Sequence, residues 1–312
     1  MAAKAWSLQQ KPVDEILFQN HAVSLCLLVG RRAKTMRIVD FRAGATPEKR
    51  RLVLELARRE GVEKVYTLVE RDEIATWVRL GFMKEASIPG FYKRSDAYML
   101  GCTVGGPLAA PFESEVRIAI DSDGTPEDLA PVDPTAHDFA EKTLAQAKRL
   151  AKDLQGGALP AVKVSDLRDA EVKKPVAAAI KSGRALTAFE PFGRDGIRRY
   201  FSLSVRGGAE IVASTESQAC FGNAFLELLT GPRTEAERVA TVAALGALCD
   251  RLLNEGVVSC FSLSPSDDLK LVTAHVCNGF RRTGLLLSHL VASGARKDAI
   301  VWSRKLAGTA DD

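Results

Sequence analysis

The chain has 312 residues, 46% of them hydrophobic and 26% charged, which is the composition of a globular protein with room for two domains. Its 43 basic and 39 acidic residues leave a formal charge of +4, and the basic residues are scattered among glutamates. This composition excludes a disordered chain and argues against a nucleic-acid groove, which needs clustered basic residues with stacking aromatic ones.

Targeting and redox signals are weak throughout the sequence. No apolar stretch is long enough for a membrane span, and residues 1–15 contain no apolar run of the kind found in signal peptides. The six cysteines are widely separated and form no C-x-x-C pair: Cys26, Cys102, Cys220, Cys249, Cys260 and Cys277. We therefore expect a cytoplasmic protein with reduced core thiols, no metal site and no membrane partner.

The first third of the chain alternates apolar runs with amphipathic stretches. Apolar runs over 22–29 and 36–41, separated by the turn-like Gly30-Arg31-Arg32, predict a pair of strands. The pattern then predicts a helix over 47–60, a strand over 62–69, a short helix over 71–80 and strands near 82–88 and 97–100. Gly61 and Gly81 stand where helices should end.

A stretch rich in proline and glycine follows, and it predicts a linker between two domains. One strand is expected inside it, over 115–120. We accordingly divide the chain into an N-terminal domain over 1–103, a linker over 104–134 and a C-terminal domain over 135–312.

The C-terminal domain is expected to hold four helices and seven strands. The helices are predicted over 135–154, 170–181, 235–254 and 267–277. The strands are predicted over 185–189, 200–205, 210–214, 224–229, 257–263, 280–287 and 299–302, with a turn at 193–196.

Short matches in the same order relate the two parts of the chain. Glu60-Gly61-Val62 corresponds to Glu255-Gly256-Val257, and Tyr66-Thr67-Leu68 to Phe261-Ser262-Leu263. Further on, Gly81-Phe82 corresponds to Gly279-Phe280 and Asp96-Ala97 to Asp298-Ala299. Four matches in one order indicate two related halves with small insertions in loops.

The element order resembles that of the GNAT N-acetyltransferases. The stretch GFMKEASIPGFYKRSDAYML, over 81–100, looks like the first domain of the beta-lysine N-acetyltransferase family, and the C-terminal half with its late KDAIVW, over 297–302, resembles that family's GNAT domain. The resemblance implies an α/β (α+β) fold of tandem GNAT-like domains, each a mixed, mostly antiparallel sheet flanked by helices. It also implies acetyl-CoA as the cofactor.

In that family the coenzyme A diphosphate binds at the start of a helix, through the free amides of a glycine-rich loop. The corresponding segment here is PRTEAERVA, over 232–240, where Ala236 and Arg238 replace glycines and Glu235 replaces an arginine. Thr234 and Glu237 form a capping-box pattern that satisfies the helix start from within. The resemblance assigns cofactor contacts to Leu228, Leu229, Thr230, Arg233, Ala236 and Arg238.

The start of the first-half helix, Thr46-Pro47-Glu48, is also self-capped and acidic. We therefore expect no second cofactor site there.

Acetyl transfer also requires a base for the amine proton and often an acid for the departing thiolate. Glu227 lies where the family carries an acidic residue and is the candidate base, with a solvent-facing or arginine-paired strand carboxylate as the alternative. His275 replaces the family's tyrosine before Gly-Phe and is the candidate acid, with a structural histidine as the alternative. Trp77, at the same place in the first half, is expected to pack in the core.

Two functions follow from these observations. The first is an acetyl-CoA-dependent N-acetyltransferase-like protein acting on a small amine. The alternative is a catalytically inactive GNAT-like binding or scaffold protein that has lost the cofactor site and binds a protein partner. Nucleic acid is not expected as a partner, and a homodimer is compatible with the sequence.

Overall fold

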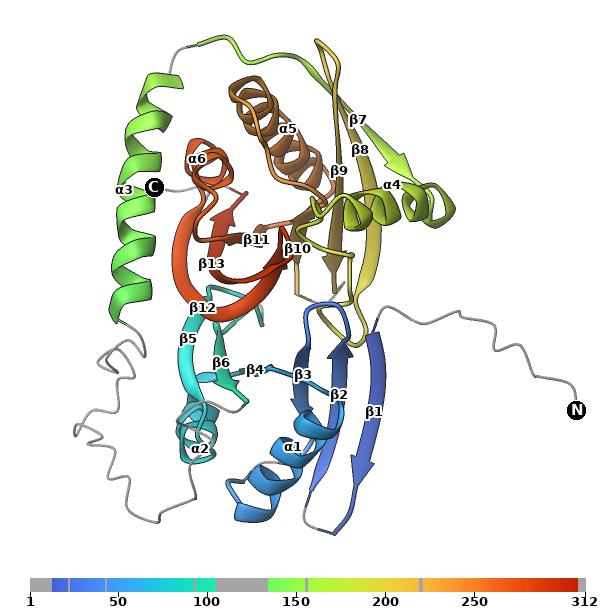
Figure 1. Ribbon diagram of the computed structural model, residues 1–312, viewed down its shortest axis with the longest axis vertical. Helices are drawn as coiled ribbons and strands as arrows, with labels where there is room; N and C mark the ends of the chain where they lie inside the picture. The colour runs from blue at the N-terminus through green and yellow to red at the C-terminus, as the bar shows by residue number, and fades with distance from the viewer. Residues whose placement is uncertain are drawn as a thin grey trace, which may run out of the picture.

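The computed structural model describes residues 13–21, 23–42, 44–92, 94–104, 134–154, 157–218 and 221–307 (Figure 1). The strand expected over 115–120 and most of the expected linker lie outside these residues. The first half holds β1 (Val13–Gln19), β2 (Ser24–Gly30), β3 (Thr35–Asp40), α1 (Pro47–Arg59), β4 (Lys64–Val69), the 3-10 turn η1 (Arg71–Glu73), α2 (Ile74–Arg79), β5 (Met83–Ile88) and β6 (Ala97–Thr103).

The second half begins with α3 (Pro134–Leu154), β7 (Val162–Leu167), α4 (Asp169–Lys181), β8 (Ile197–Val205) and β9 (Ala209–Ser217). It continues with β10 (Asn223–Leu228), α5 (Glu235–Asn254), β11 (Ser259–Pro265), α6 (Leu269–Cys277), β12 (Arg281–Ala292) and β13 (Ala295–Lys305).

The strands of both halves form one continuous sheet, in the order β1-β2-β3-β4-β6-β5-β12-β13-β11-β10-β9-β8-β7. Read from its outer edge, the first half runs β1-β2-β3-β4-β6-β5, and the second half repeats that arrangement as β8-β9-β10-β11-β13-β12, with β7 added outside. In the described residues only β3–β4 and β10–β11 pair in parallel. This is the predicted architecture: two related halves, each a mixed, mostly antiparallel sheet flanked by helices.

The strand registers place the matched sequence segments at equivalent positions. Tyr66 pairs across the parallel ladder with Arg37, and Phe261 pairs in the same way with Phe225. The two matched glycines that follow α1 and α5 also share a left-handed conformation, with φ of 66° at Gly61 and 87° at Gly256. Such φ values favour glycine because a side chain would clash with the backbone, so both halves end this helix in one way.

The join between the halves is an edge-to-edge contact of β5 with β12, where Gly284 pairs with Ala86. A Cβ on Gly284 would come within 2.3 Å of the Ala86 Cβ and the Glu85 carbonyl oxygen, so only glycine fits. A shared apolar cluster lies beside this join and includes Tyr66, Phe91, Phe192, Phe225 and Phe261. The halves therefore share a core as well as a sheet.

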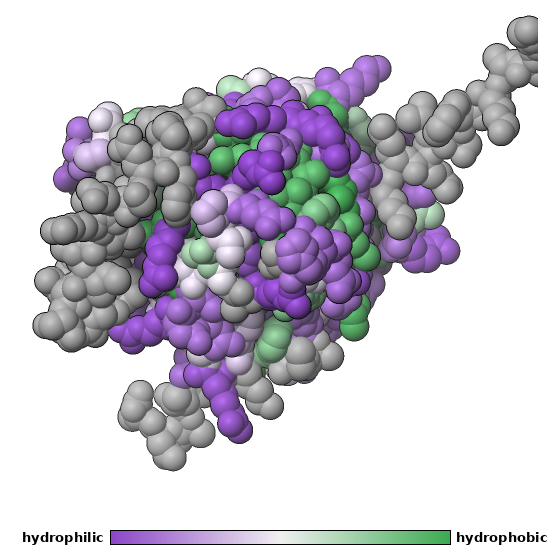
Figure 2. Space-filling model, turned by 90° about the horizontal axis from the view of Figure 1, so that it is seen from below, coloured by the Kyte–Doolittle hydropathy of each residue, from purple (hydrophilic) through white to green (hydrophobic). Residues whose placement is uncertain are grey.

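Part of the outer surface of the first half is apolar and exposed. Figure 2 shows hydrophobic surface between strongly hydrophilic patches on the face seen from below. On the edge strand β1, Leu17 is 64% exposed, and just beyond β3, Phe41 is 53% exposed. The guanidinium of Arg194 lies over the Phe41 ring, 5.7 Å from its centroid, so this ring has a cationic neighbour from the second half.

Three features of the secondary structure differ from the sequence prediction. The strand expected over 185–189 is wrong: this segment makes a single bridge, Ala185 to Thr230, and then turns at Phe189, whose φ is 56°. The strands β1 and β7 were not predicted. Both lie at sheet edges, where one side of the ladder is open and the apolar signal is weak.

No helix among the described residues is long and apolar enough to cross a membrane. The described parts of the chain also contain no group of three or more His, Cys, Asp or Glu side chains suited to a metal ion. Their five cysteines are free thiols, four of them buried.

Candidate active site

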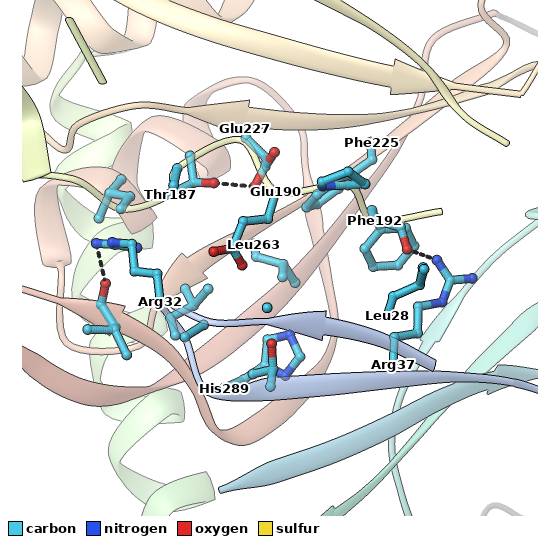
Figure 3. Close-up of a pocket in the computed structure, with 18 of the residues that line it drawn as sticks. Leu28, Arg32, Arg37, Thr187, Glu190, Phe192, Phe225, Glu227, Leu263 and His289 are labelled. Carbon is cyan, nitrogen blue, oxygen red and sulfur yellow. Dashed lines mark hydrogen bonds between the residues drawn. The ribbon is translucent and has the colours of Figure 1, made fainter. Parts of the chain in front are cut away.

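A pocket lies where the parallel strands of the second half separate. The last β10–β11 pair is Leu226 with Ser262, although β10 continues to Leu228 and β11 to Pro265. Residues 186–188 and 190–192 and the bulged part of β12 form the other walls on this side, and the β2–β3 hairpin and β4 of the first half complete the pocket (Figure 3). Its volume of about 70 Å³ has room for a small polar group.

Glu227, the predicted base, lies in this pocket. Its Oε1 accepts a hydrogen bond of 2.7 Å from the Thr187 hydroxyl, and its Oε2 accepts one of 2.7 Å from the Arg198 guanidinium. The side chain is 14% exposed. Glu227 is thus paired with an arginine, as the structural alternative proposed, while it also lines the pocket.

A second carboxylate, Glu190, faces the same pocket and had no counterpart in the sequence analysis (Figure 3). Burial raises the pKa of Glu190 to about 7, and the negative charge of Glu227 adds to this rise, while the positive charge of Arg32 opposes it. A carboxyl group with this pKa is partly ionised at neutral pH, so it can accept a proton and release it again.

The position of Glu190 depends on a bent backbone and on a distant carboxylate. The preceding residue, Phe189, has a left-handed φ of 56°. On the other side, the Phe192 amide donates a hydrogen bond of 2.9 Å to Glu216, and the Gly193 amide also donates to it. No local sequence motif predicts this placement, because Glu216, the carboxylate that accepts these hydrogen bonds, belongs to β9.

His289 closes the pocket from the β12 side (Figure 3). The β12–β13 register shifts between Leu286 and Leu290, and Ser288 has a φ of 49°, so a bulge turns the imidazole inward. The residue is 5% exposed, and its Nδ1 has no hydrogen-bond partner among the described residues. Burial lowers the pKa of His289 to about 3, so the ring is neutral at physiological pH.

His275, the predicted acid, does not line this pocket. It is 1% exposed, its Nδ1 lies 2.9 Å from the Leu271 carbonyl oxygen, and its Nε2 lies 3.2 Å from the Ser262 hydroxyl. The ring stacks on Trp302, with centroids 5.1 Å apart. Burial lowers the pKa of His275 to about 4. These contacts are those of a core histidine with both ring nitrogens in use.

The start of α5 is capped from within, as its sequence predicted. The Thr234 hydroxyl accepts a hydrogen bond of 3.1 Å from the Glu237 amide. The Glu237 carboxylate accepts one of 2.7 Å from the amide of Arg233, one residue before the Thr234 cap. Two of the amide groups at this end of the helix are therefore already paired with side chains.

The predicted cofactor residues fit a diphosphate at one point, Arg238. This residue is 5% exposed and pairs with Glu235, yet its Nε and Nη1 have no hydrogen-bond partner among the described residues. Leu229 offers little, because its amide donates to the Val212 carbonyl and its carbonyl accepts from the Leu186 amide. Leu228 is buried in the core, Thr230 is half-buried, and Arg233 and Ala236 are exposed.

The start of α1, which corresponds in the first half to the start of α5, holds a buried ion pair. Lys49 of α1 lies 2.6 Å from Asp40 at the end of β3, and the two side chains are 1% and 8% exposed. The Lys49 ammonium also donates to the Arg42 carbonyl oxygen at 2.6 Å. The Thr46 hydroxyl caps α1 by accepting from the Lys49 amide at 3.1 Å, as predicted.

No protein-family model and no curated protein matches the sequence. Solved structures similar to part of the chain include the ribosomal-protein-S18-alanine N-acetyltransferase from Escherichia coli, with 19% identity over 49% of this chain and 98% of that chain and a TM-score of 0.36. Another is the spermidine N-acetyltransferase from Vibrio cholerae in complex with CoA and spermine, with 11% identity, 46% and 95% coverage and a TM-score of 0.37. Values this low assign no activity or substrate to this chain.

Proposed function

We propose that the second half transfers an acetyl group from acetyl-CoA to a small primary amine in this pocket. The observation that supports the proposal most is the pair of carboxylates, Glu190 and Glu227, at the point where β10 and β11 separate. Two carboxylates attract an ammonium group, and the small cavity suits the end of a slender molecule.

In this proposal the two carboxylates have different roles. Glu227 is held by Arg198 and Thr187, so it is a fixed hydrogen-bond acceptor that orients the amine. Glu190, with its pKa of about 7, takes the proton that the ammonium must lose before the nitrogen can attack. The neutral His289 offers a further acceptor to the same group.

The cofactor residues follow from the start of α5. Arg238, with two unpaired guanidinium nitrogens, is the residue that would hold the diphosphate of acetyl-CoA, and Arg233 is exposed on the same loop. When bound, acetyl-CoA supplies an acetyl group activated as a thioester.

Binding of the cofactor is tested first, by calorimetric titration of the full chain with acetyl-CoA. We expect micromolar binding that Arg238→Glu abolishes, because the substitution places a carboxylate next to the diphosphate. Arg51→Glu on the exposed face of α1, where the side chain is 71% exposed, is the matched control and should leave binding unchanged. Absence of binding at millimolar acetyl-CoA would contradict the proposal.

The role of Glu190 is tested by thiol release with a panel of small primary amines. Loss of a general base lowers kcat/KM by about 10²- to 10⁴-fold, so we expect an effect of this size from Glu190→Gln. Glu55→Gln, at a side chain that is 58% exposed on α1, should retain full activity. Equal activity of both variants would remove Glu190 from the mechanism.

A binding protein without catalysis is the second candidate, and the capped start of α5 favours it. Glu235 and Glu237 lie in the first turn, where they repel a diphosphate and stabilise the helix without a ligand. A protein that binds amines in the pocket but gives no heat with acetyl-CoA would support this alternative.

A further inference from the structure

We infer that Arg32, which belongs to the first half, is a positioning residue for the pocket of the second half. Its side chain joins the two segments that form the pocket wall, and its backbone holds the Glu190 carboxylate. The link to catalysis rests on the proposed function, whereas the contacts themselves do not. The first half then serves as a part of this site.

The side-chain contacts of Arg32 cross the join between the halves (Figure 3). Its Nη2 donates to the Ala185 carbonyl oxygen at 2.6 Å and to the Val291 carbonyl oxygen at 3.0 Å. Ala185 begins the segment that carries Glu190, and Val291 follows His289 on β12. One guanidinium therefore spans the two segments that place these pocket residues.

The backbone of the same hairpin touches Glu190 directly. The main chain of Arg32 donates a hydrogen bond to the Glu190 carboxylate, and its positive charge stabilises the ionised form. A Cβ on Gly30 would lie 2.6 Å from Glu190 Oε2, so the hairpin leaves no space for a side chain there. The other titratable groups of this pocket and its surroundings are Glu227, Arg198, Glu216, Arg37, Tyr66 and His289.

This arrangement predicts how Glu190 should respond to changes at position 32. Arg32→Gln removes the positive charge and should move the protonation midpoint of Glu190 to higher pH. Arg32→Lys keeps a positive charge but loses the two-carbonyl contact, so it should shift the midpoint less than Arg32→Gln does. Arg31→Gln is the matched control, because Arg31 is 46% exposed and pairs with Asp14 and Glu60 on the opposite side of the hairpin.

The midpoint is measured on the full chain by NMR titration of carbon-13-labelled glutamate carboxyl groups. The Glu190 signal is identified by its loss in Glu190→Gln, and circular dichroism checks the folding of each variant. Gly30→Ala is a second route to the same contact, because its methyl group should displace the carboxylate and change the midpoint. An unchanged Glu190 midpoint in both folded Arg32→Gln and folded Arg32→Lys would overturn the inference.

The pH profile of amine acetylation then separates this inference from the proposed function. With Arg32→Gln we expect kcat/KM to fall several-fold at pH 7 and to recover at higher pH, with Arg32→Lys closer to the unmodified protein. A shifted NMR midpoint without any acetylation would leave the positioning role intact and refute the enzyme. If the protein acetylates amines but neither the pH profile nor the NMR midpoint changes in the Arg32 variants, only the positioning role is refuted.

Discussion

The ends of the two parallel strand pairs have the same place in the fold, and their acidic side chains have different surroundings. At the end of β3 the Asp40 carboxylate is neutralised by the buried ammonium of Lys49. At the end of β10 Glu227 faces a pocket, and Glu190 lies opposite it, where its carboxylate accepts a hydrogen bond from the Arg32 main chain and forms no ion pair among the described residues.

This difference shows how one backbone arrangement can give a closed core or a site. A buried carboxylate with a matched cation is satisfied and needs no ligand. A carboxylate whose pKa is raised towards neutrality is instead ready to exchange protons with a bound group. The three predictions below change one side of this comparison at a time.

The largest expected effect concerns the buried Lys49–Asp40 pair of the first half. Lys49→Met leaves the buried Asp40 carboxylate without its cation, and breaking such a pair costs about 3–5 kcal/mol. We expect a loss of this size in the free energy of unfolding, measured by chemical denaturation. Arg51→Met, which removes an exposed pair with Glu55 at 4.0 Å, should change it by about 1 kcal/mol or less.

The double variant Asp40→Leu with Lys49→Met removes both charges and should recover much of the stability that Lys49→Met loses. If Lys49→Met alone were as stable as the unmodified protein, the Lys49–Asp40 pair would not stabilise the end of β3.

The pocket carboxylate Glu190 is tested through the pH dependence of stability. Glu190 has an ordinary pKa of 4.5 and a folded pKa of about 7, so the folded state binds its proton more tightly than the unfolded state. The stability that this proton contributes is complete below pH 4.5 and is lost as the pH rises through about 7.

Glu190→Gln has no proton to lose, so its stability relative to the unmodified protein should rise between these two pH values, by up to about 3 kcal/mol. Denaturation curves at pH 4 to 8 check this, with Glu55→Gln as the control. A stability difference that does not vary with pH would show that Glu190 does not titrate in this range.

The smallest effects concern the two helix starts, which the comparison predicts to be alike. Thr46→Ala and Thr234→Ala each remove one hydroxyl that accepts from an amide at 3.1 Å. Loss of such a cap costs about 1 kcal/mol, so we expect similar losses from both variants in thermal unfolding. A loss of stability in Thr46→Ala alone would mean that other contacts stabilise the start of α5.

Local sequence signals predicted much of this fold correctly. Thr46 and Thr234 begin helices and Gly61 ends one, because caps and left-handed glycines act within a few residues. The matched segments around Tyr66 and Phe261 predicted a repeated arrangement, and they lie at equivalent registers of the two parallel ladders. Glu227 was predicted as a site residue because it lies near the end of an apolar strand at a position that the family resemblance marks, and it lines the pocket.

The composition of the pocket was decided by tertiary structure. Glu190 and Arg32 meet because Gly284 and Ala86 pair at the join, which brings the β2–β3 hairpin against the second half. His275 was predicted as the acid but lies in the core, and His289, which was not predicted, lines the pocket, because neither core burial nor a bulge can be recognised from periodicity. Sequence alone determined most of the elements and their order, because those depend on neighbours along the chain. Which polar groups share one cavity depends on contacts between segments more than a hundred residues apart, and only the folded sheet makes those contacts.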